Sequence, residues 1–450
     1  MMGFLVYFNV VEAGEFLASP YNRRANLFAE RVVRGSIIDG SGNVLAETRV
    51  REDGTFYRVY PYGSVFSHVI GYDSRRVGRI GLEAAENSSL LTSNVFFVDQ
   101  LLNELNNQRS QGDNVMTTLD ANLQVAAYHA LGNHRGAVMV KEASTGYILA
   151  MVSKPGFDPN EIDILWDQLN VDEENSPLLN RVTQGLYAPG STFKTITTLA
   201  YMRQYDPFEY YFNCTGSYLR DGVMIPCFGN RAHGGQDMRV AFANSCNSAY
   251  ADLGAIIDPT LFRDTAEDLM FNGSLPLVMT SFAHPSSSFP LNAYSIMAER
   301  MMTAIGQGDT MVSPYHMTLI TAAIANGGVL MEPYLVYSVK NATGNVVRRN
   351  LPRNYRTLMT SEEAAILKDY MSAVVTQGTA IEMSGQSFTV AGKTGTAEFG
   401  REEEGRVHSW FTGFTNVDNP ELVITVVLEG VADGTRAVPV ALQILWAYYY

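Results

Sequence analysis

Apolar residues in the second half of the chain follow two different periods. Two unbroken apolar runs of strand length, at 136–141 and 147–152, are joined by a Ser-Thr-Gly turn and predict a β-hairpin. Other apolar runs predict three more strands, at 388–398, 408–415 and 421–429. Apolar residues at helical spacing predict further helices, which open at Ser191, lie near 237–254, 316–327 and 361–376, and start near Val438.

The order of these elements indicates the fold class. Strands at both ends of a segment with helices between them predict an α+β fold, in which the terminal segments share one antiparallel sheet. We therefore expect residues 132–450 to form one domain with a central antiparallel sheet flanked by helices. The stretch 155–180, which is rich in Pro, Asp and Asn, is predicted to be a loop.

The first part of the chain has a more mixed pattern. Residues 35–46 predict a hairpin that turns at 39–42, residues 95–108 have helical spacing, and Asp120 precedes a helix that runs through Leu131. No cluster of reactive side chains occurs here. We expect residues 21–131 to form a smaller, mixed α/β pedestal domain in front of the larger one.

The chain begins with the apolar run MMGFLVYFNVV. A helix that spans a membrane needs about 20 apolar residues, so this run is too short to cross alone. It lacks the basic start and the small-residue cleavage site of a signal peptide. We expect residues 1–20 to be the outer end of a truncated single-pass anchor, with a packed N-terminal helix as the alternative.

Composition excludes several classes of protein. The 450 residues are 46% hydrophobic and 17% charged, which does not fit a disordered chain, a collagen or a coiled coil. The formal charge of −14 makes nucleic acid an improbable partner. Only six residues are lysines, so a lysine at a special spacing carries information.

Cysteine and histidine give little indication of metal or disulfide chemistry. Three cysteines are too few for a disulfide framework, although Cys214 and Cys227 are close enough in sequence for a local bridge. Two small buried hydrophobic residues are the other interpretation of this pair. The seven histidines show no H-x-x-x-H or H-E-x-x-H spacing, so neither a metal site nor a cofactor is predicted.

The segment Tyr187-Ala-Pro-Gly-Ser-Thr-Phe-Lys is the most informative part of the sequence. Ser191 falls at the start of a predicted helix, where unpaired N–H groups and the helix dipole favour negative charge. Lys194 follows one helical turn later on the same face. A lysine whose pKa is lowered by burial can serve as the base that a serine nucleophile needs. An N-cap serine beside a solvated lysine is the structural alternative.

A second candidate is Ser245-Cys246-Asn247, which lies in a helical region. A Ser and an Asn two residues apart suit a tight turn between helices, where both side chains face one cleft. The hydroxyl would relay a proton, and the amide would hold a carbonyl or orient a lysine. The same spacing at Ser41-Gly42-Asn43 falls in a predicted hairpin turn, and we interpret that copy as structural.

A third candidate is the stretch 391–398, which lies within a predicted strand. Gly395 would let a ligand backbone lie against the strand. Thr394 and Thr396 offer hydroxyls, and Lys393 offers a positive charge for a carboxylate. A phosphate-binding loop also uses Gly-Lys-Thr, but it needs Gly at 387, where this chain has Ser, and a following helix. His233, His408 and Trp410 are further candidates to line the cleft, with packing as the alternative.

Together the three motifs occur in the order found in serine β-lactamases and penicillin-binding proteins. Arg34-Gly-Ser-Ile-Ile-Asp, His68-Val-Ile-Gly-Tyr, Gly306-Gln-Gly and His408-Ser-Trp-Phe resemble stretches of class B penicillin-binding proteins. The likeness extends from about Arg34 to near Ala447. It implies a transpeptidase domain of the β-lactamase/transpeptidase type behind an N-terminal pedestal of the dimerisation type.

The resemblance also implies a reaction. Ser191 would attack the D-Ala-D-Ala bond of a peptidoglycan stem peptide, release D-Ala and pass the acyl group to an amine of a neighbouring strand. Lys194, Ser245, Asn247 and Lys393 would be the other catalytic residues, with Thr394, Gly395 and Thr396 binding substrate. The backbone N–H groups of Ser191 and Thr396 would form the oxyanion hole. β-Lactams would be trapped on the same serine.

The family likeness further implies partners, a location and alternatives. It implies a membrane glycan polymerase of the SEDS family as partner and a catalytic domain outside the cell membrane. A β-lactamase is disfavoured, because between Asn247 and Lys393 no Glu is followed four residues later by Asn. A D,D-carboxypeptidase shares the nucleophile. A β-lactam sensor would need a long transmembrane signalling region, and a silent assembly factor would be expected to have lost Ser191 or Lys194.

Overall fold

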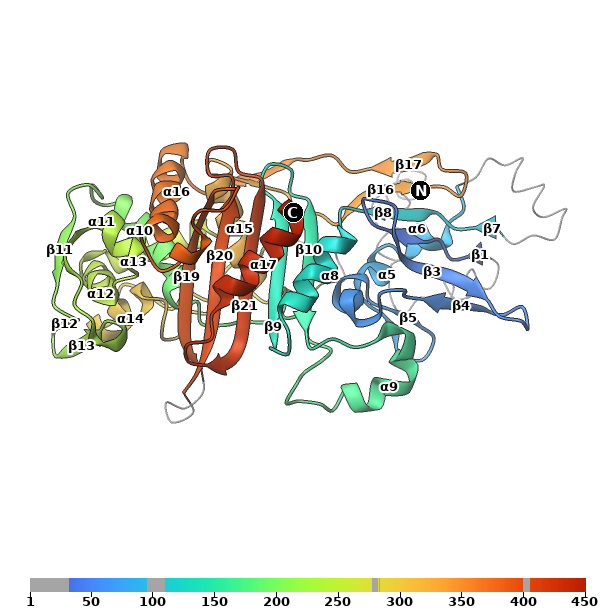
Figure 1. The fold of residues 1–450 in the computed structure, drawn as a ribbon, viewed down its shortest axis with the longest axis horizontal. Helices are drawn as coiled ribbons and strands as arrows, with labels where there is room; N and C mark the ends of the chain where they lie inside the picture. Colours follow the sequence, from blue (N-terminus) through green and yellow to red (C-terminus); the bar gives the residue numbers. More distant parts are fainter. Residues whose placement is uncertain (1–31, 95–109, 277–281, 283, 400–404) are drawn as a thin grey trace, which may run out of the picture.

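The computed structural model of the chain describes residues 32–94, 110–276, 282, 284–399 and 405–450 (Figure 1). The helix expected at 95–108 and the apolar run expected to be an anchor remnant lie outside these residues. Among the described helices, none combines the length and the apolar character that crossing a bilayer requires.

An antiparallel sheet of five strands forms the centre of the C-terminal part. Its order is β10-β9-β21-β20-β19, so the segment at 136–154 pairs with the end of the chain. This arrangement confirms the predicted antiparallel sheet, and every strand falls where the apolar runs predicted one. The bounds are β9 (Gly136–Glu142), β10 (Ile148–Lys154), β19 (Val390–Phe399), β20 (Arg406–Thr415) and β21 (Leu422–Ala432).

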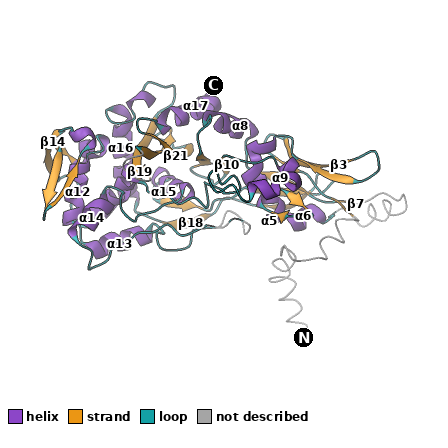
Figure 2. Ribbon diagram, turned by 90° about the horizontal axis from the view of Figure 1, so that it is seen from below, coloured by secondary structure: helices purple, strands orange, loops and turns teal. Residues whose placement is uncertain are grey.

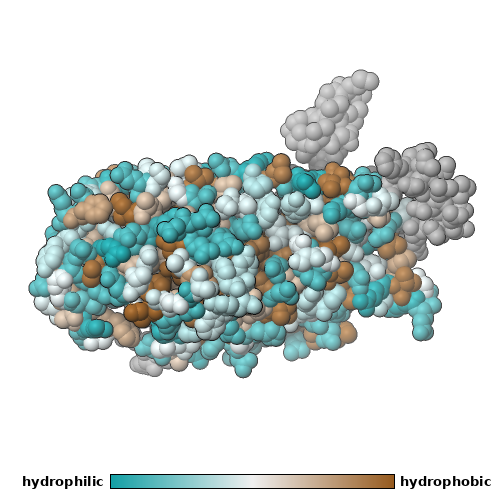
Figure 3. Space-filling model, turned by 45° about the horizontal axis from the view of Figure 1, so that its top comes forward, coloured by the Kyte–Doolittle hydropathy of each residue, from teal (hydrophilic) through white to brown (hydrophobic). Residues whose placement is uncertain are grey.

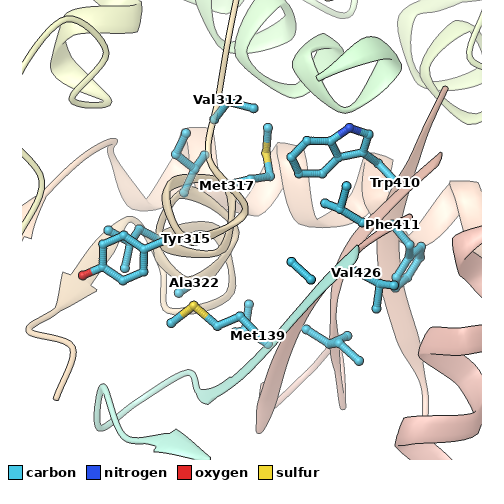
Figure 4. Close-up of a cluster of buried hydrophobic side chains, with 14 of the residues drawn as sticks. Met139, Val312, Tyr315, Met317, Ala322, Trp410, Phe411 and Val426 are labelled. Atoms are coloured by element: carbon cyan, nitrogen blue, oxygen red, sulfur yellow. The ribbon is translucent and has the colours of Figure 1, made fainter. Parts of the chain in front are cut away.

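Helices cover both faces of this sheet (Figure 2). α8 (Ala121–Ala130) and α17 (Ala437–Tyr449) lie on one face, and α15 (Pro314–Ala325) lies on the other. All residues of α15 are buried, which explains why its sequence is apolar on every side. Figure 4 shows Met317 and Ala322 of this helix among side chains of the sheet that include Met139 and Phe411.

A mostly helical region lies beyond β19 (Figure 1). The predicted helix at 237–254 is two helices that meet at a turn around Ser245, and the predicted helix at 361–376 is present. Two short strand pairs, β11–β14 and β12–β13, precede the turn and were not predicted. The elements are α10 (Lys194–Met202), β11 (Tyr211–Cys214), β12 (Ser217–Arg220), β13 (Val223–Pro226), β14 (Gly234–Asp237), α11 (Met238–Ala243), α12 (Asn247–Ile256), α13 (Pro259–Asp268), α14 (Met297–Ala304) and α16 (Ser361–Thr376).

The N-terminal part is built on a six-stranded sheet of order β17-β16-β8-β2-β3-β4. The predicted hairpin is present, and the Asp39 carboxylate accepts the N–H groups of Ser41 and Asn43 in its turn. Two strands of this sheet come from the C-terminal half of the chain, so both halves build it. The bounds are β2 (Ile37–Ile38), β3 (Val44–Val50), β4 (Phe56–Val59), β8 (Asn114–Thr117), β16 (Val336–Lys340) and β17 (Val346–Arg349).

Short elements complete the N-terminal part and one edge of the C-terminal part. Four are two-residue strands, three are helices of one turn, and two form a strand pair beside α15. They are β1 (Val32–Val33), β5 (Asp73–Ser74), β6 (Gly78–Arg79), β7 (Ser110–Gln111), α4 (Ser67–Ile70), α5 (Gly81–Ala85), α6 (Asn87–Leu91), β15 (Val329–Met331) and β18 (Asn354–Thr357).

The stretch predicted to be a loop contains a helix, α9 (Ile162–Leu169). The Asp158 carboxylate accepts the N–H of Asn160 in the preceding turn, and Pro159 occupies the first position of that turn. Ile162 is buried, and Asp167 on the outer side pairs with Arg76 of the N-terminal part. The apolar face is too short to stand out among the surrounding Pro, Asp and Asn residues, which explains why the loop prediction was wrong here.

The surface agrees with the acidic composition. On the face shown in Figure 3, hydrophilic residues predominate and hydrophobic residues form small, separate patches. Patches of this size are ordinary for a folded chain.

Candidate active site

Ser191 lies in a short 3₁₀ turn, Gly190–Phe193, that leads directly into α10. Its side chain is half-buried, whereas Lys194 at the first position of α10 is fully buried. The turn is anchored from behind, because Gly190 donates its N–H to the carbonyl oxygen of Gly306 at 2.9 Å. The predicted helix start is therefore present, with the serine on its exposed edge.

Lys194 joins the first two motifs. Its amine donates to the Ser245 carbonyl oxygen at 2.7 Å, the Ser245 hydroxyl at 3.3 Å and the Asn247 side-chain oxygen at 2.7 Å. Within the described part of the chain, its hydrogen bonds run to these two residues rather than to Ser191. Burial lowers the pKa of Lys194 to about 7, so the amine loses a proton near neutral pH.

Ser245 occupies the turn between α11 and α12, as the sequence predicted. Its φ of 55° lies in the left-handed region, which costs a residue with a side chain about 1 kcal/mol or more. Two backbone hydrogen bonds hold the turn. The N–H of Ser245 donates to the carbonyl oxygen of Phe242, and the N–H of Cys246 donates to the carbonyl oxygen of Ala241. This backbone aims the Ser245 hydroxyl into the space between the two lysines.

Lys393 reaches the same hydroxyl from β19. Its amine donates to the Ser245 hydroxyl at 2.9 Å and to the Thr394 carbonyl oxygen at 3.1 Å. Burial, with a smaller contribution from Lys194, lowers the pKa of Lys393 well below its usual value. The sequence predicted a positive charge on Lys393, whereas its burial and the neighbouring Lys194 disfavour that charge.

The turn at Gly190–Phe193 packs directly against β19. We call it the nucleophile turn, after the role that the sequence predicts for Ser191. A Cβ on Gly190 would lie 2.3 Å from the carbonyl oxygen of Thr396, and one on Gly395 would lie 2.8 Å from the carbonyl oxygen of Pro189. Glycine at 395 therefore lets the turn approach the strand, which is a reason the sequence analysis did not give. Thr396 itself is exposed beside the turn, and Thr394 is half-buried.

One residue of the site, Thr379, was not predicted from the sequence. Thr379 shares a hydrogen bond between hydroxyls with Thr394 at 2.6 Å, and its N–H donates to the Ala243 carbonyl oxygen at 3.2 Å. It connects the end of α11 to β19. The sequence signal available for this residue was the glycine before it, Gly378. A Cβ at Gly378 would lie 2.3 Å from the Ala243 carbonyl oxygen, so the close approach needs glycine there.

Two of the remaining candidates, Trp410 and His408, serve packing. The Trp410 indole donates to the carbonyl oxygen of Ala188 at 3.1 Å, which supports the nucleophile turn from below. His408 is buried beside Tyr187, and its ring accepts the N–H of Gly430. His233 lies apart from both, with its Nδ1 3.4 Å from the sulfur of Cys214. Cys214 and Cys227 are free thiols whose sulfurs are 3.6 Å apart.

The phosphate-loop interpretation is excluded by the local structure. Residues 392–394 lie inside β19, which continues to Phe399 as a strand. A phosphate loop would instead lead into a helix whose N-terminus faces the phosphate. The arrangement of Ser191, Lys194, Ser245 and Lys393 is suited to activating a hydroxyl as a nucleophile.

Family models match most of the chain. Residues 136–445 match the penicillin binding protein transpeptidase domain, and residues 34–115 match the penicillin binding protein A dimerisation domain. The first match alone spans more than half of the sequence.

Individual relatives and solved structures agree with these matches. The peptidoglycan D,D-transpeptidase PbpA of Mycolicibacterium smegmatis is 32% identical over 95% of this chain and 90% of its own length. The imipenem acyl-enzyme complex of penicillin-binding protein A from M. tuberculosis has a TM-score of 0.84 and 29% identity, covering 93% of this chain and 98% of that one. A D,D-transpeptidase domain from Eggerthella lenta has a TM-score of 0.82 and 30% identity, covering 93% and 98%.

Proposed function

The chain belongs to the penicillin-binding protein transpeptidase family and acts as a peptidoglycan D,D-transpeptidase, and we propose that Ser191 is its nucleophile. The observation that carries the assignment is the meeting of three motifs. Lys194 and Lys393 both donate to the Ser245 hydroxyl, and the turn that holds Ser191 packs on β19 beside Thr396.

In the acylation step, the Ser191 hydroxyl attacks the carbonyl carbon of the penultimate D-Ala. Lys194 takes the hydroxyl proton, in keeping with its pKa of about 7. The Ser–O–C ester forms and the C–N bond to the last D-Ala breaks, with Ser245 passing a proton to the departing amine. The N–H groups of Ser191 and Thr396 stabilise the oxyanion, a contribution of about 3–4 kcal/mol per donor elsewhere.

In the second step, an amine of a neighbouring strand attacks the ester. A new amide C–N bond forms as the ester C–O bond breaks, and the proton lost by the attacking amine passes through Ser245 and Lys194 to the Ser191 oxygen, which completes the crosslink. The Asn247 amide holds the acyl peptide from the same side as Lys194. The Asn247 side-chain oxygen accepts a hydrogen bond from the Lys194 amine. These proton transfers need one neutral amine, which burial of both lysines favours.

Recognition of the terminal carboxylate falls to β19. The Thr394 and Thr396 hydroxyls lie along the strand on either side of Gly395, beside the nucleophile turn. An arriving carboxylate favours protonation of Lys393, because an opposite charge stabilises an ammonium group. Substrate binding thus supplies the charge that Lys393 lacks when buried alone.

Penicillin labelling tests the nucleophile. A β-lactam acylates the serine by opening its own ring, so the adduct persists on the protein. We expect a fluorescent penicillin to label the chain and Ser191→Ala to lose the label completely. Ser384→Ala, at an exposed serine away from the site, should label like the unchanged protein. Persistent labelling of Ser191→Ala would refute the assignment.

A stem peptide with an amine acceptor separates crosslinking from hydrolysis. Mass spectrometry should detect the amide product in excess over the free acid. Predominant free acid would instead indicate a D,D-carboxypeptidase. We also expect slow hydrolysis of the penicilloyl ester, because the Glu-x-x-x-Asn spacing of class A β-lactamases is missing between Asn247 and Lys393; rapid nitrocefin turnover would contradict this.

We further infer that the protein works at the outer face of the cell membrane with a glycan polymerase of the SEDS family. The apolar run at the start of the chain supports an anchor, and the six-stranded N-terminal module supports a spacing and docking role. Co-purification of the anchored protein with such a polymerase from membranes tests this inference. Purification of the anchored protein from membranes without such a polymerase would contradict it.

A further inference from the structure

All three cysteines of the chain and one histidine meet in a single cluster outside the reacting groups. They are Cys214 at the end of β11, Cys227 after β13, His233 before β14 and Cys246 at the start of α12. The three sulfurs and one ring nitrogen of His233 all lie within 4.8 Å of one another. The thiols are buried and the histidine is half-buried. Distant parts of the sequence therefore bring four metal-ligating atoms to one point.

The individual distances fit one tetrahedral ion. Cys227 lies 3.6 Å from Cys214 and 3.7 Å from Cys246, measured between sulfurs, and the His233 Nδ1 lies 3.4 Å from the Cys214 sulfur. Zinc–sulfur bonds of about 2.3 Å and a zinc–nitrogen bond of about 2.0 Å at tetrahedral angles require edges of about 3.8 Å and about 3.6 Å. These three edges are within a few tenths of an ångström of the required lengths, and the other three are at most 4.8 Å.

Groups around the cluster favour thiolates. Ser248 donates its N–H to the Cys227 sulfur at 3.5 Å, and its hydroxyl lies 3.1 Å from the same atom. Ala249 donates its N–H to the Cys246 sulfur at 3.4 Å. These donors belong to the first turn of α12, a helix of ten residues whose positive end faces the sulfurs. Such surrounding hydrogen bonds orient ligands and stabilise their anionic form.

We propose that this cluster is a zinc site with four protein ligands: Cys214, Cys227, Cys246 and His233. Each thiol releases its proton to solvent as its sulfur bonds to the ion. Soft thiolates and an imidazole in a closed, four-coordinate arrangement select zinc and indicate a structural ion rather than a catalytic one. A disulfide would use two of the sulfurs and leave the third and the imidazole without a role. The His-spacing rules applied to the sequence missed this site because it contains a single histidine.

The site has a consequence for the active site. Cys246 is the middle residue of the Ser245-Cys246-Asn247 turn, so an ion bound there ties this turn to β11, β13 and β14. The left-handed backbone of Ser245 is thereby held in place through the residue that follows it in the turn. The four ligands are positioning residues for the proposed reaction, and none of them contacts the reacting atoms.

Metal and thiol analysis of the intact protein tests the proposal. Protein purified without chelator should contain about one zinc per chain, and its thiols should react with a thiol reagent only after a strong chelator removes the metal. Cobalt(II) added to the zinc-free protein should give the sulfur-to-cobalt absorption band of a thiolate site. Zinc-free protein with three reactive thiols, or with one thiol and one disulfide, would overturn the proposal.

Variants locate the metal. Cys214→Ser and His233→Ala should each lower zinc content or affinity at least tenfold, whereas His134→Ala, at an exposed histidine far from the cluster in sequence, should not. Full zinc retention by both cluster variants would place the ion elsewhere and refute the site. Circular dichroism checks that the variants fold, and the zinc and thiol values of the unchanged protein decide the question if they do not.

Discussion

Ser245 lies between two amines that come from different elements. Lys194 on α10 and Lys393 on β19 both donate to its hydroxyl, at 3.3 and 2.9 Å. Burial lowers the pKa of both amines, and like charges this close disfavour the doubly protonated state. In the mechanism proposed above, the shared hydroxyl carries the proton between them.

Removing that hydroxyl should slow acylation. We expect Ser245→Ala to lower the rate of penicillin acylation by about 10²–10⁴-fold, the usual range for a lost proton-transfer group. Stopped-flow or gel-based labelling at several drug concentrations measures the rate. Ser41→Ala, in the exposed copy of the same spacing, is the matched control and should leave the rate unchanged. An unaltered rate in Ser245→Ala would show that the proton takes another route.

The structure brings together the motif residues that the sequence singled out. Several contacts between them, and one further residue, were not predicted. The motif residues could be predicted because each has an unusual side chain at a fixed spacing. Thr379 could not, because a threonine after a glycine is common and its role depends on the tertiary contact with Thr394. The contact between Lys194 and the Asn247 amide was one of the roles predicted for Asn247, whereas the contacts of Lys194 with Ser245 were set by the fold.

At the scale of elements, the site depends on the contact between the nucleophile turn and β19. Gly190 combines a φ of 52° with a backbone approach that leaves no space for a side chain. A substitution there must displace the turn that carries Ser191 from the strand that carries Thr396. Small displacements of this kind strongly reduce catalysis, because reacting groups must be aligned.

We expect Gly190→Ala to reduce penicillin acylation at least tenfold and to lower the melting temperature. Gly132→Ala is the matched control, because Gly132 has a φ of 54° with no atom within 4 Å of the added Cβ. The control should lose only about 1–2 kcal/mol from the strained backbone. Labelling rates and thermal melts of both variants give the comparison. Equal effects in the two would mean that the close contact with Thr396 is unimportant.

A buried lysine in the central sheet leads to a second prediction at the scale of elements. Lys141 in β9 is fully buried, its amine has no hydrogen-bond partner among the described residues, and burial lowers its pKa to about 7. The unfolded chain keeps this proton up to about pH 10. Between pH 7 and 10 the unfolded state therefore binds more protons, and the free energy of unfolding rises with pH.

Lys141→Met should raise the free energy of unfolding at pH 7 by about 1–3 kcal/mol, the cost of an unsatisfied buried donor. The gain should shrink as the pH approaches 10, because the unfolded chain then loses this proton as well. Denaturant unfolding at pH 7 and pH 9.5 measures both effects, with the half-buried Lys340→Met as the control. A variant less stable than the parent at pH 7 would mean that the amine has a stabilising partner.

Most of the central sheet was predictable because β9, β10 and β21 are continuous apolar runs, buried on both faces. The short strands β11 to β14 and β17 were not predictable from the sequence. β11 to β14 are four residues each and mostly exposed, and all residues of β17 are exposed, so no apolar periodicity marks them. Without periodicity, pairing partners are set only by tertiary contacts.

On the scale of the whole molecule, the two sheets are linked by shared chain. β16 and β17 from the C-terminal half complete the N-terminal sheet, and Thr118, directly after β8, donates its N–H to Leu335 and its hydroxyl to Ile148. The resemblance to a pedestal followed by a catalytic domain predicted two modules in sequence order. It did not predict that the chain returns to the first module. We therefore expect the two parts to unfold together.

Glu83 provides a test of that coupling. It is fully buried and binds Arg34 and Arg58 through its two oxygens, each at 2.6 Å. Glu83→Gln removes the carboxylate that Arg58 pairs with and leaves Arg34 only the more distant Asp73, at 3.6 Å, which should cost about 3–5 kcal/mol. Calorimetry should show one transition at a lower temperature.

The exposed pair Arg263–Glu267 is the control, and Glu267→Gln should change stability by less than about 1 kcal/mol. Two separate transitions in Glu83→Gln, with only the earlier one shifted, would contradict the coupling.

The most direct test of the central claim is the position of a covalent β-lactam adduct on the unmodified protein. After incubation with penicillin G, proteolysis and tandem mass spectrometry should locate a single penicilloyl ester on Ser191. An adduct on any other side chain, or no adduct on a folded protein, would contradict the claim that Ser191 is activated where the three motifs meet.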